Sequence, residues 1–158
     1  MNAQEFLEDR GIEFDVIQCP DPYDPPHQSQ TVLGSDWNVA KTVLLKADHG
    51  YAYIVAILPA RARADLAKIS ATMGGSKIEF ATEFDIETYC PDSEYGALLP
   101  FGTHYALKTL VDESLVDAGR ILFKGTSHQE AIRMRYEDFQ RLESPLVADF
   151  AIRPEEVA

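Results

Sequence analysis

The strongest constraint on the fold is a pair of apolar segments separated by a short turn. Residues 39–47 read VAKTVLLKA and residues 51–58 read YAYIVAIL, so both are rich in aliphatic and β-branched side chains. Asp48, His49 and Gly50 lie between them, and aspartate close to glycine is typical of a tight turn. The pattern predicts two strands joined as a hairpin, which is the clearest structural element in the chain.

The rest of the chain alternates irregularly between predicted helices and strands. The predicted helices lie at residues 2–11, 61–73, 83–89 and 136–142, with Gly74-Gly75 ending the second and Thr82 as N-cap of the third. Further strands are predicted at 14–18, 77–80, 107–112, 120–124 and the end of 125–134. This order favours one α/β domain over 1–158, a mixed sheet covered by helices.

Two segments predict little regular structure. Residues 19–30 hold four prolines, which is typical of a connecting loop and, less often, of a flap over a pocket. The tail that begins at Glu143 ends in acidic residues, and we expect it to be partly loose.

The net negative charge of the chain limits which macromolecules it is expected to bind. The 158 residues carry 14 lysines and arginines against 26 aspartates and glutamates, a formal net charge of −12. Such a chain has no general attraction to nucleic acid or anionic membranes, so DNA and membranes are not expected partners. One placed cation could still bind one phosphate. Arg61 and Arg63, or Arg133 and Arg135, could add a local basic edge.

Nothing in the sequence predicts export or insertion into a membrane. No apolar run reaches the roughly 18 residues of a spanning helix, and the N-terminus does not resemble a secretory signal. Cys19 and Cys90 lie far apart and form no C-x-x-C pair. We therefore expect reduced thiols and a cytoplasmic protein.

Familiar catalytic and metal-binding signatures do not occur in the sequence. It holds no nucleophile elbow, zinc-protease motif, P-loop or dinucleotide fingerprint. The four histidines stand singly, without metal-ligand spacing to another histidine, cysteine or aspartate. We therefore expect neither a metal nor a cofactor. The carboxylates could supply a catalytic pair, but the sequence does not identify which of them approach one another.

Lys41 is a cation inside an apolar strand. Its side chain either faces solvent or points into a pocket, where the ammonium group would bind an anion as a compact point charge. Lys46 has the same two alternatives, and its place beside the turn favours solvent.

Two further segments carry candidate functional groups. Gly96-Ala97-Leu98-Leu99-Pro100, continued by Phe101-Gly102, has few side chains that can form hydrogen bonds. It is either a bulged strand or a surface that positions an oxyanion or water through its peptide N–H and C=O groups. Thr126-Ser127-His128 follows the predicted strand 120–124. A histidine there could bind a substrate amine or carbonyl, or cap a turn.

Taken together, these segments resemble one family. VAKTVLLKA, YAYIVAILPARARADLAKI, EYGALLPFG, VDESL and GTSHQEAIRM are similar to the YbaK/EbsC family, the editing domain associated with prolyl-tRNA synthetase. The resemblance runs from about residue 30 to about residue 142 and implies a mixed sheet curled into a partial barrel with helices outside. It also implies a free-standing, metal-independent deacylase. Such an enzyme hydrolyses the ester between a mischarged amino acid and the 3′-terminal adenosine of tRNA.

The resemblance assigns roles to individual residues. Lys41 matches a lysine that contacts the phosphate region of the terminal adenosine. The segment from Gly96 to Pro100 matches a G-x-x-x-P loop whose backbone places the ester and the attacking water, assisted by the ribose hydroxyl. His128, together with Ser127, matches a position that reads the amino acid. The pocket walls would be Ala97, Leu98, Leu99 and Val43, favouring a small residue such as Ala, Ser, Thr or Cys.

Two alternatives to this deacylase stay open. Family members often carry Asn-Ala-Gly where this chain has Lys124-Gly125-Thr126-Ser127-His128, so the glycine is displaced by one. That departure favours a non-catalytic module that binds aminoacyl-tRNA, a synthetase or an aminoacyl-like small ligand. The other alternative is a hydrolase or transferase acting on another small ester. For the deacylase, the expected partner is the 3′ end of aminoacyl-tRNA, with an aminoacyl-tRNA synthetase as a second candidate.

Overall fold

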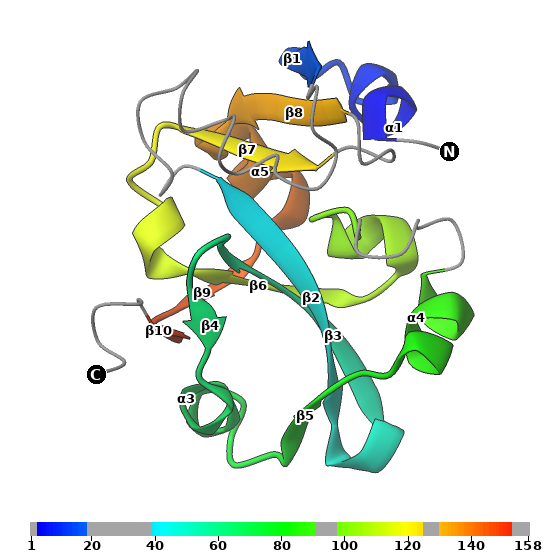
Figure 1. Cartoon of the computed structure of the whole chain (residues 1–158), viewed down its shortest axis with the longest axis vertical. Coiled ribbons are helices and arrows are strands. Elements are labelled where there is room, and N and C mark those ends of the chain that lie inside the picture. Colours follow the sequence, from blue (N-terminus) through cyan, green and yellow to red (C-terminus); the bar gives the residue numbers. More distant parts are fainter. Residues whose placement is uncertain (1–2, 19–38, 91–97, 125–129, 153–158) are drawn as a thin grey trace.

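The predicted hairpin forms the centre of the molecule. The computed structural model describes residues 3–18, 39–90, 98–124 and 130–152 (Figure 1). Within these, β2 (Ala40–Ala47) and β3 (Ala52–Pro59) pair antiparallel along their whole length. The turn between them is the 3-10 element η2 (Asp48–Gly50), in which Gly50 has a φ of +107° that favours glycine.

The hairpin belongs to a five-stranded mixed sheet in the order β5-β2-β3-β6-β9. The added strands are β5 (Ile78–Phe80), β6 (Lys108–Asp112) and β9 (Leu146–Ala148). β5 pairs antiparallel with β2, whereas β6 runs parallel to both β3 and β9. The mixed sheet predicted from the sequence is therefore confirmed.

The resemblance implied one sheet curled into a partial barrel. The remaining described strands instead form two separate sheets. β1 (Phe14–Gln18), β8 (Glu130–Arg135) and β7 (Arg120–Lys124) pair antiparallel in the order β1-β8-β7. β4 (Arg63–Ala64) pairs with β10 (Ala151–Ile152). A single parallel bridge, Val39↔Leu122, joins the start of β2 to β7. Among the described residues, the backbone pairing thus passes from the five-stranded sheet to the three-stranded sheet at this bridge.

Each predicted helix is present. They are α1 (Ala3–Asp9), α3 (Leu66–Thr72), α4 (Glu83–Tyr89) and α5 (Tyr136–Glu143), with short 3-10 turns η3 (Gly102–Tyr105) and η4 (Glu113–Leu115). Thr82 caps α4 as predicted, in a reciprocal capping box with Asp85. The expected start of the second helix at residue 61 is wrong. Asp65 accepts the N–H groups of Ala67 and Lys68, so α3 begins after it.

The prediction of a loose tail is wrong for residues 146–152. These residues form β9 and β10, and the Phe150 side chain is fully buried. Buried Asp112, at the end of β6, accepts the N–H groups of Phe150 and Ala151, each at 2.8 Å. A carboxylate that satisfies two backbone donors fixes this segment, a long-range contact that residue patterns do not reveal. Residues 153–158 and the proline-rich segment 19–30 lie outside the described part of the chain.

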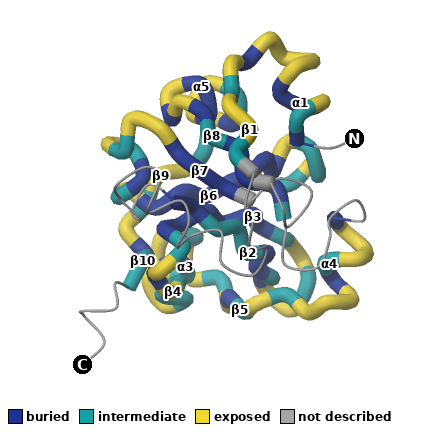
Figure 2. Tube along the Cα trace, turned by 45° about the horizontal axis from the view of Figure 1, so that its top comes forward, coloured by how far each residue is buried: buried dark blue, intermediate teal, exposed yellow. Residues whose placement is uncertain are grey.

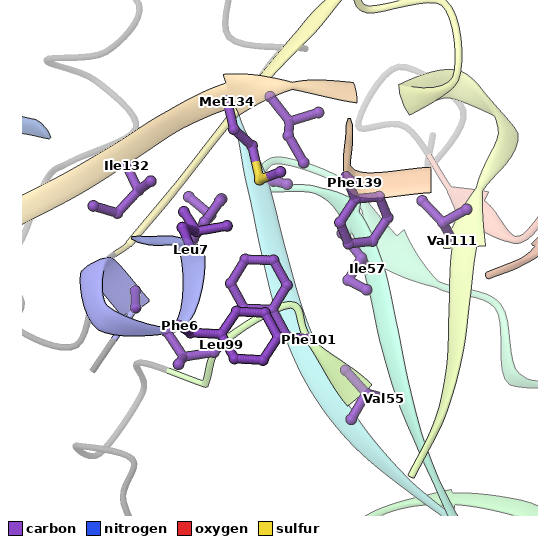
Figure 3. Close-up of a cluster of buried hydrophobic side chains, with 14 of the residues drawn as sticks. Phe6, Leu7, Val55, Ile57, Leu99, Phe101, Val111, Ile132, Met134 and Phe139 are labelled. Carbon is purple, nitrogen blue, oxygen red and sulfur yellow. The ribbon is translucent and has the colours of Figure 1, made fainter. Parts of the chain in front are cut away.

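Both faces of the central hairpin are covered, and its strands are largely buried (Figure 2). One face packs against α1, α5 and the segment leading into η3, where Phe6, Phe101 and Phe139 gather (Figure 3). The Phe6 and Phe101 rings stack with centroids 4.5 Å apart. The other face packs against Ile69 of α3 and against Phe150. Full burial of each such side chain contributes about 1.5–3 kcal/mol, so this packing fixes the loops around the sheet.

Candidate functional site

Lys41 lies at the start of β2, on the face of the hairpin that packs against Ile69 and Phe150. It stands directly opposite Leu58 of β3, and strand alternation places it on the same side as Val43. Leu58 is fully buried, and Val43 packs against the cluster that contains Ile69 and Phe150. The lysine is therefore set into an apolar face rather than projecting from a polar one.

The Lys41 ammonium group has no counter-ion among the described residues. Its side chain is half-buried, and this burial lowers the pKa of the amine below its ordinary value of 10.5. No described carboxylate or carbonyl forms an ion pair or hydrogen bond with it. A partly desolvated, unpaired cation costs stability, and an anion from outside the chain would relieve that cost.

Lys46 gives a contrast within the same strand. Its Nζ lies 3.7 Å from a carboxylate oxygen of Asp85, on the opposite face, and its side chain is 23% exposed. Asp85 also accepts the Tyr53 hydroxyl at 3.0 Å and the Thr82 N–H at 2.9 Å. Lys46 therefore belongs to a structural cluster that ties α4 to the hairpin. It is neither a solvated charge nor a candidate for binding substrate.

The strand pairing brings the start of β2 next to the end of β7. Val39, two residues before Lys41, bridges Leu122, and both chains continue from there in the same direction. Val39, Leu122 and Ala131 form a small buried cluster, with Ile17 and Ala60 packed against it. The Ala60 N–H also donates to the Val39 carbonyl at 2.8 Å. This apolar cluster lies on the strand face that carries Lys41, because Val39 and Lys41 are two residues apart.

Of the predicted residues that read the amino acid, Ser127 and His128 lie outside the described part of the chain, as do Gly96 and Ala97. The strands that flank residues 125–129 are described. Lys124 at the end of β7 pairs with Ala131 of β8, which belongs to the cluster beside Lys41. The described strands on either side of residues 125–129 thus pair close to the start of β2, and the roles of Ser127 and His128 stay predictions.

The described part of the glycine–proline loop packs on the other face of the hairpin. Leu99, Pro100 and Phe101 are buried, and Leu98 is half-buried. Leu99 packs with Phe6 and Phe101 in the cluster that contains Leu44 and Val55 (Figure 3). The structure therefore does not bring the Leu99 side chain together with Lys41. Residues 98–101 contribute core packing from one side of the sheet, and Lys41 projects from the other.

The loop is held by contacts that the sequence did not indicate. The Leu99 N–H donates to the Tyr105 hydroxyl at 3.0 Å. Buried Glu143, at the end of α5, accepts the Thr103 N–H at 3.0 Å, the Thr103 hydroxyl at 2.6 Å and the Thr109 hydroxyl at 3.1 Å. These partners lie up to 40 residues apart in sequence, so no local pattern could have identified them. They fix the turn that follows Pro100.

Gly102 is required by close packing at the same turn. A Cβ atom there would lie 2.7 Å from the Leu107 carbonyl oxygen and closer still to the Thr109 hydroxyl.

Cys90, at the end of α4, is 1% exposed, and burial raises the pKa of its thiol to about 11. A thiol with that pKa supplies almost no thiolate near neutral pH, so Cys90 has a packing role.

Other features of the described residues do not suggest a second site for this chemistry. No group of three or more metal-ligating side chains comes together in the described ranges. A groove of about 670 Å³ beside η4 is lined by Asp112, Glu113, Asp117 and Asp149 and by one cation, Lys68, which pairs with Asp149, so its net negative charge would repel a phosphate. No helix that the structure describes is long and apolar enough to cross a membrane.

Solved structures share this arrangement of sheets and helices. The hypothetical protein APE2540 superposes with a TM-score of 0.80 at 15% sequence identity, covering 94% of this chain and 97% of that one. A crystal structure described as a candidate trans-editing enzyme for prolyl-tRNA synthetase gives a TM-score of 0.79 at 19% identity, covering 94% and 93%. At these identities the likeness concerns the fold.

Sequence comparison addresses the family. The multifunctional Ser/Thr-tRNA deacylase ProXp-y of Escherichia coli K12 is 27% identical over 101 residues, which span 62% of this chain and 59% of that protein. The family model of the aminoacyl-tRNA editing domain matches residues 28–142, well over half of the chain, and confirms the resemblance seen in the sequence. The protein therefore belongs to the aminoacyl-tRNA editing domain family.

Proposed function

We propose that the protein is a trans-editing deacylase that removes a small mischarged amino acid, such as Ala, Ser, Thr or Cys, from the 3′-terminal adenosine of tRNA. The observation that carries the proposal is Lys41, a half-buried cation that no described residue neutralises. Membership of the editing-domain family supports the reaction class. The name of the E. coli relative, a Ser/Thr-tRNA deacylase, supports a small hydroxylated amino acid among the substrates.

In this proposal Lys41 binds the phosphate of the terminal adenosine. The phosphate would provide the counter-ion that the ammonium group lacks and would return the pKa of the amine toward its ordinary value. The backbone of Lys41 is fixed by its pairing with Leu58 in β3, and the buried Val39 cluster lies two residues before it. A fixed point charge at the nucleotide end holds the ester in register with the groups that act on it.

The glycine–proline loop then supplies peptide groups to the reacting ester. Pro100 has no N–H, and the Leu99 N–H is already bonded to Tyr105. Among the loop residues that the structure describes, Leu98 keeps an N–H that no described residue accepts, and we assign the same role to the peptide groups of Gly96 and Ala97. Two or three peptide donors aimed at one oxygen stabilise the charge that develops on the ester carbonyl during attack.

The chemical step is hydrolysis of an ester. Water adds to the carbonyl carbon, the bond from that carbon to the ribose oxygen breaks, and the ribose oxygen takes the proton that water loses. The products are the free amino acid and uncharged tRNA. An ester is already activated, so positioning and charge stabilisation are sufficient, and we propose that the reaction needs no metal. Ser127 and His128 read the amino acid in this scheme.

A deacylation assay tests the proposal. The wild-type protein is incubated with tRNAs mischarged with Ala, Ser, Thr or Cys, in parallel with Lys41→Ala and with Lys46→Ala as the matched control from the same strand. We expect hydrolysis of at least one substrate and a loss of about 10- to 100-fold in kcat/KM for Lys41→Ala, the range for one charge-assisted contact. Activity of the wild-type protein should survive a chelator.

Three outcomes would contradict this proposal. Full activity of Lys41→Ala would remove the lysine from the mechanism. Binding of aminoacyl-tRNA or capture of a synthetase without any turnover would identify a non-catalytic module instead. Turnover of a small ester with no dependence on tRNA would point to another class of hydrolase.

A further inference from the structure

Two strands of the three-stranded sheet are basic in a chain that is acidic overall. Strands β7 and β8 together hold four cationic residues and one acidic residue, although the whole chain carries a net charge of −12. Arg120 begins β7, and Arg133 and Arg135 end β8. These three arginines, with Asp15, Glu13 and the backbone around them, line a groove of about 460 Å³. We call it the arginine groove.

The register places the three arginines on one face. Arg120 stands directly opposite Arg135, and Arg133 stands opposite Leu122, which is two residues from Arg120. Like charges directly opposite in an antiparallel pair destabilise a sheet. The fold gains nothing from this pairing, since Arg120 and Arg135 are both exposed. A polyanionic ligand would turn the repulsion into attraction.

Most of the guanidinium donors in the groove remain available. Arg133 uses Nε and Nη2 on Asp15, at 3.0 and 2.6 Å, and Arg135 uses Nη2 on Glu137 at 2.8 Å. No described carboxylate forms an ion pair with Arg120. Each guanidinium has five N–H donors, so the two paired arginines keep at least three each for another acceptor. Exposed ion pairs contribute little and exchange readily for phosphate.

The arginine groove and Lys41 lie on the same face of their strands, on either side of the buried Val39–Leu122 bridge. Leu122 and Val39 bridge each other within the apolar cluster described above. Arg120 lies two residues before Leu122, and Lys41 lies two residues after Val39, on the same strand faces. Because the bridge is parallel, Arg120 and Lys41 are four residue steps apart along the strand direction, roughly 13 Å. A nucleic-acid strand of several nucleotides is long enough to span this separation.

We propose that the arginine groove binds the phosphodiester backbone of the tRNA strand that leads to the terminal adenosine held at Lys41. This inference rests on the proposed function, because it takes the adenosine at Lys41 as its starting point. RNA is favoured over an anionic membrane because a narrow basic strip on a chain of net charge −12 matches a single phosphate strand. The groove would supply affinity for tRNA and leave the ester chemistry to the site at Lys41.

Kinetics with substrates of different length test the groove. Arg120→Gln, Arg135→Gln and the double variant are compared with Arg141→Gln, an exposed arginine on α5 that pairs with Asp138 outside the groove. Each is assayed on mischarged tRNA and on the 3′-aminoacyl ester of adenosine monophosphate, in 50 to 200 mM salt. Thermal unfolding confirms that each variant is folded.

The expected result is a loss that depends on RNA length and on salt. Each arginine that contacts a phosphate should make the wild-type KM for tRNA rise about threefold between 50 and 200 mM salt. Each substitution should therefore lower the slope of log KM against log salt concentration by about 0.7–0.9. The loss on tRNA should exceed the loss on the short ester by several-fold. Arg141→Gln should keep the wild-type slope.

Several results would overturn the inference. An unchanged tRNA KM and salt slope in the double variant, with an active wild-type enzyme, would show that the groove does not bind RNA. So would an equal loss in Arg141→Gln, or a double variant that loses a synthetase partner but keeps tRNA. If the wild-type enzyme hydrolyses no ester, the proposed function fails, and binding of uncharged tRNA still tests the groove. Equal binding by wild-type and double variant would then reject it.

Discussion

Replacement of Lys41 by methionine should stabilise the protein while it lowers deacylase activity. The Lys41 ammonium group is half-buried, lies on an apolar strand face and has no described counter-ion. Burial lowers the pKa of this amine, which means that the folded state disfavours the charged form. At neutral pH, where the unfolded chain carries the charge freely, this group therefore opposes folding.

The expected gain is modest because the group is only partly buried. Methionine keeps the unbranched stem that packs against Leu58 and removes the charge. Substitutions that relieve such a cost at functional positions commonly yield about 0.5–2 kcal/mol, and solvent screening of a half-buried group places Lys41→Met at the lower end. We expect the free energy of unfolding to rise by about 0.5–1 kcal/mol.

Lys46→Met provides the matched control. It removes a cation from the same strand, but one whose Nζ lies 3.7 Å from Asp85. Loss of that ion pair should lower the free energy of unfolding by up to about 1 kcal/mol. The two substitutions are therefore expected to change stability in opposite directions. Their effects on deacylation should also differ, because Asp85 already neutralises Lys46, whereas no described residue neutralises Lys41.

Urea unfolding at pH 7, followed by circular dichroism, measures both variants, and the deacylation assay is run on the same preparations. The reasoning is refuted if Lys41→Met lowers the free energy of unfolding by more than 0.5 kcal/mol, roughly the smallest effect expected for a lost hydrogen bond. That result would mean that Lys41 is satisfied within the folded chain. Its ammonium group would then not lack a counter-ion that a substrate phosphate could provide.

The remaining predictions concern the supports of the loop and α4. Glu143→Gln should lower the free energy of unfolding by about 2–3 kcal/mol in urea, because its amide nitrogen would face buried donors; a change below about 0.5 kcal/mol would contradict this. Gly102→Ala should cost about 3 kcal/mol, since its Cβ would lie 2.7 Å from a backbone oxygen, and near-wild-type stability would show that the turn can shift. The backbone N–H of Thr82 holds the pKa of Asp85 below its ordinary value of 3.8, so the carboxylate stabilises the fold above that pH and loses this effect as the pH falls through the lower value. The difference in unfolding free energy between wild type and Asp85→Asn should therefore shrink below about pH 4, and a constant difference would contradict the assignment.

Local signals predicted the elements that depend on local residues. The hairpin of β2 and β3 follows from two apolar runs around Asp48-His49-Gly50. The start of α4 follows from Thr82, whose side chain caps the helix wherever the rest of the chain lies. The helix expected at 61–73 was too long because Arg63–Ala64 pairs with β10, a contact made nearly 90 residues away. No pattern within the helix region contains that information.

The candidate site was predictable in the same limited sense. The sequence singled out Lys41 as a cation in an apolar strand, and the structure adds that no described residue neutralises it. The sequence could not show which face of β2 carries Lys41, because both faces are apolar: Leu44 and Leu45 follow each other in β2 and pack against opposite clusters. Strand alternation places Lys41 with Leu45, on the face away from Leu99. The expectation that Leu99 lines the pocket came from order along the chain, whereas side-chain direction depends on packing.

This division between the two faces has a consequence for how substitutions act. Phe6, Phe101 and Glu143 hold the loop from the core face, and none of them lies on the strand face that carries Lys41. Loss of a contact there should misplace the peptide groups that act on the ester and lower kcat, while the phosphate contact, and with it KM, is largely kept. Loss of Lys41 or of the arginine groove should chiefly raise KM, because those cations contact parts of the substrate that do not react.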